Sequence, residues 1–372
     1  MSHLAVRKPM SIAIDPTSLH APLAGAPRAT RDWSVAAMGA PSVTLVCCVE
    51  SGRLEPMTLR MIESLRRFGG AFADCPVVAV KPRLGPPLTA ATRQGLERWN
   101  VRYEQLPVRR RYGWYNFMNK PVTLATLQNE LDTESVAWLD SDVLFLNEPL
   151  EYRLGDDEDA IVCVPDRGVI GTTGPDDPFD TYWAAVCGVL GLELEALPWV
   201  TSQVDGQRIR FYCNGGIFLY RRSTGFAQTY LRTCRKLMDE RLRFAWSGVY
   251  WLEQMAVGLS MLLHGLRIRV MPDTHDYTVM VKLHERCGQP SFGQVRVLHY
   301  HDAMSPSFFD TLLSYLEQAH PSVYAWLTRQ APIADPSSRP ARAMQLVLRG
   351  ARRAAREWHL RRCRVVRNPK DP

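Results

Sequence analysis

Two aspartates separated by one residue, Asp140 and Asp142, follow directly on the apolar run Val136–Leu139. A short apolar run of this kind is typical of a buried strand, so both carboxylates are expected where a strand ends. Paired carboxylate oxygens suit a hard divalent cation that keeps free positions for phosphate oxygens. The spacing therefore favours chemistry on a phosphorylated or nucleotide-activated substrate. The alternative is a simple turn, because Asp and Ser often follow strands and bond local backbone groups.

A second candidate segment is Asn214-Gly215-Gly216, which lies between two strand-like runs. Two glycines let the backbone approach a ligand closely. The Asn214 amide can both donate to and accept from sugar hydroxyls. The alternative is a hairpin turn, since Asn-Gly is a strong hairpin signal.

Two histidines, His299 and His301, end the late apolar run 295–298. Alternation along a strand predicts that one of them faces the site and the other the opposite side. A neutral imidazole beside the carboxylates of Asp140 and Asp142 makes a mixed nitrogen and oxygen site, which suits Mn²⁺ as well as Mg²⁺. The alternative is that both are ordinary core or surface histidines.

An acid and an amide stand side by side at Glu253-Gln254, near the start of a predicted helix. They could bind hydroxyls or stabilise positive charge at a sugar carbon, or they could simply be solvated. Lys120 precedes the aspartate strand and could neutralise a diphosphate as a point charge.

The elements that position these residues are short apolar strands alternating with helices. We expect strands at 42–50, 76–80, 101–106, 135–139, 160–164, 217–221, 268–271 and 295–298. We expect helices at 56–68, 89–99, 179–190, 224–242, 250–263, 308–319 and 323–329, and another that opens with Asn119 as its N-cap. This order indicates a largely parallel α/β sheet, in which ligands bind at the carboxyl ends of strands.

The chain divides into three segments by composition. Residues 1–41 are rich in Pro, Ala, Ser and Thr and are expected to be disordered. Residues 42–330 form the α/β body, and 331–372 form a linker with a basic tail. From residue 339 onward, the tail holds eleven Arg or Lys residues against Glu357 and Asp371. Its net positive charge is therefore larger than the +7 of the whole chain. The near-neutral body argues against a nucleic-acid binder.

The basic tail also carries apolar residues at helical spacing. They are Met344, Val347, Leu348, Ala351, Ala355 and Trp358. A helix with such a face and many arginines is typical of an element that lies on an anionic membrane surface. The alternative is a solvated or disordered basic tail.

Bulk composition is ordinary, at 46% hydrophobic and 22% charged residues. No apolar run approaches the length of about 20 residues that a membrane span needs. Residues 1–31 lack a continuous apolar segment, so we expect no signal peptide. The nine cysteines include no Cys-x-x-Cys pair, which favours reduced thiols in the cytoplasm and argues against structural zinc. We therefore expect a cytoplasmic protein. The basic tail leaves open peripheral attachment at the inner face of a membrane.

The order of these motifs resembles that of the GT-A fold glycosyltransferases, most closely the glycogenin-like, retaining glycosyltransferase family 8. The likeness runs roughly from residue 43 to 307 through Asn119-Lys120, VAWLDSDVLFLNEPLE, YCNGGIFLYRRS, LEQMAVG and VLHYHD. It implies a GT-A (Rossmann-like) fold, with a mixed, mainly parallel sheet flanked by helices. It also implies a nucleoside diphosphate sugar donor, with a UDP-sugar favoured, and Mn²⁺ or Mg²⁺ as cofactor.

The resemblance also assigns roles to single residues of this chain. It implies that Asp140, Asp142 and His299 hold the metal. It places Lys120, Asp140, Ser141, Asp142, Gly215, Gly216 and His301 on the donor. It gives Glu253, Gln254 and Asn214 catalytic roles, and it implies transfer with retention of configuration.

Three departures from the family pattern leave the donor open. The family's Asp-Gln pair reads Glu253-Gln254 here, the Lys-Pro-Trp after the late histidine is replaced by AMSPSFF, and the first strand lacks the usual residues for uridine. The acceptor, a glycan, a lipid-linked group or a protein, is also open, as is the choice between retention and inversion.

Two other functions compete with this interpretation. A strand followed by Asp-x-Asp is also the nucleophile motif of haloacid-dehalogenase-like phosphatases, with Asp140 as nucleophile. That family needs a downstream acidic pair in a suitable position, which this sequence lacks, and its aspartate strand usually comes first. The second alternative is a non-catalytic scaffold that acts through its membrane-docking tail.

Overall fold

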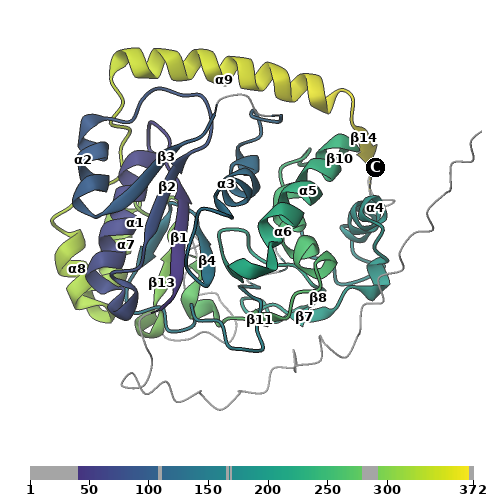
Figure 1. The fold of residues 1–372 in the computed structure, drawn as a ribbon, viewed down its shortest axis with the longest axis horizontal. Helices are drawn as coiled ribbons and strands as arrows, with labels where there is room; N and C mark the ends of the chain where they lie inside the picture. Colours follow the sequence, from purple (N-terminus) through teal and green to yellow (C-terminus); the bar gives the residue numbers. More distant parts are fainter. Residues whose placement is uncertain (1–40, 108–110, 165–166, 168–169, 279–291, 368–372) are drawn as a thin grey trace, which may run out of the picture.

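The computed structural model describes residues 41–107, 111–164, 167, 170–278 and 292–367, so nearly all of the segment expected to be disordered lies outside it. A seven-stranded sheet forms its centre, in the order β11-β6-β9-β4-β1-β2-β3 (Figure 1). The strands are β1 Val43–Cys48, β2 Val77–Lys81, β3 Val101–Gln105, β4 Ser135–Leu139, β6 Ala160–Val162, β9 Ile217–Arg221 and β11 Ile268–Val270. Within this sheet only β9 is antiparallel, to both β4 and β6. The predicted mixed, mainly parallel sheet is confirmed.

Helices cover both faces of this sheet. They are α1 Leu54–Phe68, α2 Ala90–Arg98, α3 Asn119–Leu127, α4 Asp180–Leu190, α5 Phe226–Asp239 and α6 Leu252–Leu263. Side chains alternate along each strand, so Leu45 and Leu139 pack with α1 and α2, while Val46 and Trp138 pack with α3, α5 and α6. Burial on both faces explains why the strands are continuously apolar in sequence.

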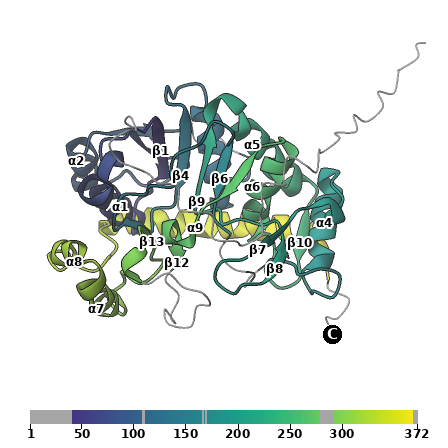
Figure 2. The ribbon, with the colours of Figure 1, turned by 90° about the horizontal axis from the view of Figure 1, so that it is seen from below.

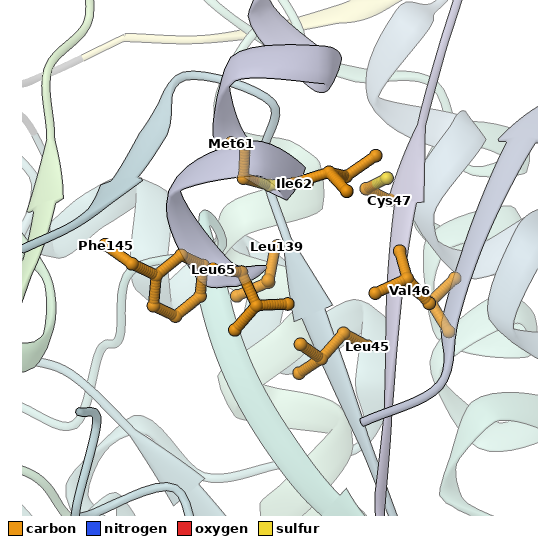
Figure 3. Close-up of a pocket in the computed structure, with 9 residues that line it drawn as sticks. Leu45, Val46, Cys47, Met61, Ile62, Leu65, Leu139 and Phe145 are labelled. Atoms are coloured by element: carbon orange, nitrogen blue, oxygen red, sulfur yellow. The ribbon is translucent and has the colours of Figure 1, made fainter. Parts of the chain in front are cut away.

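The core under α1 is densely filled. Figure 3 shows Met61, Ile62 and Leu65 of α1 against Leu45 and Leu139. Each such buried side chain stabilises the fold by about 1.5–3 kcal/mol. This packing fixes the end of β4, from which the aspartate pair follows.

A small second sheet lies beside the main one, in the order β12-β13-β5. Its strands are β5 Val143–Phe145, β12 Tyr277–Thr278 and β13 Val297–His299. The antiparallel register of β13 with β5 places His299 opposite Val143, next to Asp142. Two helices, α7 Phe309–Ala319 and α8 Pro321–Leu327, pack their apolar residues against this sheet.

Two further strand pairs complete the sheets. β7 Trp199–Thr201 pairs with β8 Arg208–Arg210, and β10 Leu242–Phe244 pairs with β14 Arg364–Val366.

The expected tail helix is α9, Arg339–Leu360, and it crosses the molecule as the yellow helix of Figures 1 and 2. Ser338 caps it, because its hydroxyl accepts from the backbone N–H of Ala341. The chain then continues into β14. Among the described residues, no helix is long and apolar enough to cross a membrane.

The predicted N-cap at Asn119 is wrong. Asn119 has helical backbone angles, φ −59° and ψ −41°, and a 3₁₀ turn at Asn116–Met118 leads into α3. The Asn119 amide instead donates to Glu50 Oε1 at 3.2 Å. The Asn119 side chain therefore contacts the loop that follows β1 and does not cap α3.

Candidate active site

Asp140 follows β4 with both carboxylate oxygens engaged. Oδ1 accepts from the indole N–H of Trp138 at 2.8 Å, and Oδ2 accepts from Lys120 Nζ at 3.2 Å. Its backbone N–H donates to the carbonyl of Gly216 at 2.8 Å. These bonds hold the Asp140 carboxylate in one orientation and join it to the Asn-Gly-Gly segment.

Asp142 meets both late histidines. Its Oδ1 lies 3.2 Å from His299 Nε2, and its Oδ2 lies 3.5 Å from His301 Nδ1. One ligand atom from each of the three residues lies within 4.8 Å of the others. Within the described part of the chain, this is the group that could hold a metal ion; Asp140 is not in it, whereas His301 is.

The expectation that the two histidines face opposite sides is wrong. β13 ends at His299, and His301 has a positive φ of 47°. Strand alternation therefore stops between them, and both rings turn toward Asp142. Their ring centroids lie 4.3 Å apart.

Asp142 and the late histidines influence one another's charge. Burial opposes the charge on Asp142, but the two histidines outweigh it and hold the pKa of Asp142 well below its usual value. Burial likewise opposes the charge on His299, but Asp142 and Asp276 raise the pKa of that imidazole well above its usual value. A concentration of negative charge around the buried His299 imidazole is suited to a cation.

Behind His299 lies a carboxylate that sequence reasoning missed. Asp276 is buried, and its Oδ1 lies 3.1 Å from His299 Nδ1. Such a contact fixes the ring, so that Nε2, which faces Asp142, is the nitrogen that could act as a ligand. The second oxygen of Asp276 is buried and has no hydrogen-bond partner among the described groups.

Lys120 joins three parts of the site from the first turn of α3. Its Nζ lies 2.8 Å from the Gly215 carbonyl, 3.2 Å from Asp140 Oδ2 and 3.7 Å from Glu253 Oε2. Burial opposes the positive charge, but Asp140 and Glu253 outweigh it and raise the pKa of Lys120. Lys120 is therefore a permanent buried cation.

The Asn-Gly-Gly segment is not the turn of a hairpin, because β8 pairs with β7, whereas β9 pairs with β4 and β6. Asn214 Oδ1 accepts from the backbone N–H of Gly216 at 2.8 Å. A Cβ on Gly216 would lie 2.5 Å from His299 Cε1, and one on Gly215 would lie 3.3 Å from Glu253 Oε1. The glycines thus allow the site's side chains to approach the backbone.

Glu253 lies in the first turn of α6 and is buried rather than solvated. The Tyr230 hydroxyl donates to its Oε1, and its backbone N–H donates to the Tyr115 hydroxyl at 3.2 Å. Burial is the main cause that raises the pKa of Glu253. Its neighbour Gln254 donates from Nε2 to the Tyr212 hydroxyl. Sequence reasoning missed Tyr230, since it looks like an ordinary core aromatic.

Ser141 turns into the protein between the two aspartates. Its hydroxyl donates to the Cys48 carbonyl at 2.7 Å and accepts from Thr58 Oγ1 at 3.1 Å. The side chain thereby braces the aspartate turn against β1 and α1, and its predicted donor contact stays a prediction.

Comparison with known proteins places this chain in a family. No curated protein matches the chain. A solved structure, the glycosyltransferase GlyE in Streptococcus pneumoniae TIGR4, is 11% identical with a TM-score of 0.44; the match covers 79% of this chain and 65% of that one. The family model of the Rhodobacterales glycosyltransferase domain matches residues 45–265. This stretch includes Lys120, Asp140, Asp142 and Glu253 and ends before the late histidines. Because the match extends over more than half of the chain, the protein belongs to the Rhodobacterales glycosyltransferase domain family and is a glycosyltransferase.

Proposed function

We propose that this glycosyltransferase moves a sugar from a nucleoside diphosphate sugar in a metal-dependent reaction, on a GT-A fold similar to that of glycosyltransferase family 8. The observation that carries the proposal is the cluster of Asp142, His299 and His301, with its 3.2 and 3.5 Å contacts. These residues come from the turn between β4 and β5 and from the end of β13. Family membership sets aside the phosphatase and the non-catalytic scaffold.

The ligand atoms of Asp142, His299 and His301 fit a divalent cation. One carboxylate and two imidazoles offer oxygen and nitrogen ligands, a mixture that favours Mn²⁺ over Mg²⁺. The contact from Asp276 to His299 Nδ1 supplies the outer support that metal-ligating histidines usually have. When bound, the metal would neutralise charge on the leaving diphosphate. Asp140, which sequence resemblance assigns to the metal, instead accepts from Lys120 and Trp138, so we give it the role of orienting Lys120.

Lys120 and the Asn-Gly-Gly segment act beside the metal ligands. Lys120 holds a positive charge between Asp140 and Glu253, next to the place where we propose that the diphosphate leaves. A preorganised charge of this kind commonly contributes about 3–4 kcal/mol to lowering a barrier. Gly215 and Gly216 keep the backbone close to the donor, and Asn214 and Gln254 offer amides to sugar hydroxyls.

Glu253 faces the sugar as a fixed carboxylate in this proposal. One oxygen accepts from Tyr230, and the other lies 3.7 Å from Lys120. Because both oxygens have partners, we assign Glu253 to positioning the acceptor or opposing positive charge at the sugar carbon, and not to nucleophilic attack. Retention by same-face attack is part of the proposal on the strength of the resemblance to family 8.

The test is a panel of UDP- and GDP-sugars assayed for hydrolysis or transfer with Mn²⁺, with Mg²⁺ and with chelator. We expect Asp142→Asn to lower turnover by about 10²–10³. The matched control, Asp302→Asn, changes an exposed carboxylate paired with Arg53 and should keep full activity. Binding of Mn²⁺ alone, followed by calorimetry, gives a second readout. Unchanged turnover and unchanged Mn²⁺ binding in Asp142→Asn would disprove the proposal.

A further inference from the structure

Helix α9 exposes several large apolar side chains. Its large exposed apolar side chains are Met344 at 38%, Leu346 at 71%, Val347 at 71% and Trp358 at 55%. Met344, Val347 and Trp358 alternate with the exposed Ala351 and Ala354 at spacings of three and four residues. These five residues form one continuous strip along the helix, which we call the apolar stripe of α9.

A different face of α9 packs on the body. Gln345 Nε2 donates to the Ser51 carbonyl at 2.9 Å, Arg352 donates to the Leu84 carbonyl, and the His359 ring lies 5.1 Å from that of Trp114. The helix is therefore anchored without the apolar stripe. An exposed apolar surface that is not needed for folding indicates an interaction site.

Positive charge accompanies the apolar stripe. From Arg339 to Arg367 the chain holds ten arginines and one acidic residue, Glu357. Nearly all of these arginines are exposed, and Arg362 lies over the Trp358 ring, 3.8 Å from its centroid. Arginines beside an exposed apolar strip with a tryptophan near its end match the chemistry of an anionic lipid surface. A second copy of this helix is a poor partner, because like charges would repel.

The position of α9 relates this surface to the site. Ser51, Leu84 and Trp114 lie in the loops that follow β1, β2 and β3. These strands are parallel to β4, so their carboxyl ends lie at the same edge of the sheet as Asp140. Figure 1 shows α9 running across this edge.

We propose that α9 docks on an anionic lipid bilayer, with the apolar stripe in the interfacial region and the arginines on headgroup phosphates. Docking would bring the carboxyl edge of the sheet to the bilayer, so that the transferase can act on acceptors anchored there. This last step rests on the proposed function, whereas the docking itself does not.

The test is co-sedimentation of the full chain with vesicles of phosphatidylcholine alone, or with roughly one lipid in three replaced by phosphatidylglycerol. We expect binding to the mixed vesicles only, weakening as salt is raised. Trp358→Gln should lower the partition coefficient about tenfold. The double variant Arg349→Gln, Arg356→Gln should lower it about 30-fold.

Matched controls change the same residue types elsewhere on the surface. Phe308→Gln removes an exposed aromatic at the start of α7, and Arg98→Gln with Arg329→Gln removes two exposed charges. These controls should bind like the unaltered chain. Equal binding to neutral vesicles, an equal loss in the controls, or a lipid-free dimer that Trp358→Gln disrupts would overturn the proposal.

These experiments test membrane docking and catalysis independently of each other. Vesicle binding is measured without donor or metal, so Asp142→Asn should bind as the unaltered chain does. Donor hydrolysis in solution does not involve α9, so Trp358→Gln should retain it. If the unaltered chain does not bind the mixed vesicles but still hydrolyses the donor, docking is rejected and the proposed function stands.

Discussion

The carboxylate of Asp276 lies 3.1 Å from His299 Nδ1, while Nε2 of the same ring lies 3.2 Å from Asp142. The ring is thus held at both nitrogens. Because Asp276 is buried and outside the proposed ligand group, its effect on metal binding can be measured apart from ligation itself.

We expect Asp276→Asn to weaken Mn²⁺ binding by about 10–100-fold, the usual cost of losing such an outer contact. The amide keeps the size of the side chain but removes the charge that supports His299. Calorimetric titration of Mn²⁺ into the donor-free protein measures the change. Asp302→Asn is the control, and an unaltered affinity in Asp276→Asn would show that Asp276 does not support the metal site.

Gly216→Ala should disturb the site through contact alone. Its Cβ would lie 2.5 Å from His299 Cε1, closer than real Cβ contacts allow, so either the ring or the backbone must move. We expect a loss of about 1–3 kcal/mol in the free energy of unfolding, together with weaker Mn²⁺ binding. Denaturant titration checks the first effect and calorimetry the second.

The matched control is Gly188→Ala in α4, where a Cβ would meet nothing within 4 Å. Alanine is the better helix former, so this control should leave stability unchanged or raise it by about 1 kcal/mol. Equal effects of the two substitutions would mean that contact with His299 is not the cause.

Lys120→Met should be costly, because it leaves Asp140 and Glu253 without their shared cation. Removing one partner of a buried ion pair costs about 3–5 kcal/mol of stability. The double variant Lys120→Met, Glu253→Gln removes one of the two stranded charges, the more deeply buried one, so it should be more stable than Lys120→Met alone. Thermal unfolding of the four proteins of this cycle gives the coupling, and strict additivity would argue against direct interaction.

Tyr230→Phe should make stability more sensitive to pH. Burial already raises the pKa of Glu253 above the ordinary 4.5, and loss of the Tyr230 hydroxyl would raise it further. Between the unfolded and the folded pKa the folded state binds more protons, so stability falls as pH rises through that interval. The interval should be wider in Tyr230→Phe, as denaturant titrations from acid to neutral pH can measure.

Tyr182→Phe is the control for this substitution. The Tyr182 hydroxyl is buried and has no hydrogen-bond partner among the described residues. Its loss should therefore leave the pH dependence unchanged. The same pH dependence in both variants would show that Tyr230 does not act through Glu253.

The sequence predicted the parts of this site that depend on local pattern. The apolar run before Asp140 places the aspartate turn at a strand end, and the order of strands and helices predicts the sheet. The sequence could not predict the orientation of His301, because this depends on a positive φ after β13. Asp276 was missed because it meets His299 across 23 residues of chain, and nothing in its own segment indicates that contact.

The tail illustrates the same limit at a larger scale. Its spacing predicted an amphipathic helix, and α9 is one. Which face would be buried depends on carbonyl groups of Ser51 and Leu84, far away in sequence. Leu348 and Ala355, which belong to the predicted apolar face, are accordingly half-buried, whereas Met344, Val347 and Trp358 stay exposed.

The pairing of β14 with β10 has a consequence for how the tail should be manipulated. Gln345 fastens α9 near its start to the loop after β1, and β14 fastens the chain beyond its end to β10. Cutting the chain before α9 would strip a strand from β10 and uncover Tyr112 and Trp114, which now pack on His359. A truncated protein would then expose unpaired backbone of β10 and the rings of Tyr112 and Trp114. Vesicle binding measured on it would reflect these exposed groups as well as the absence of α9.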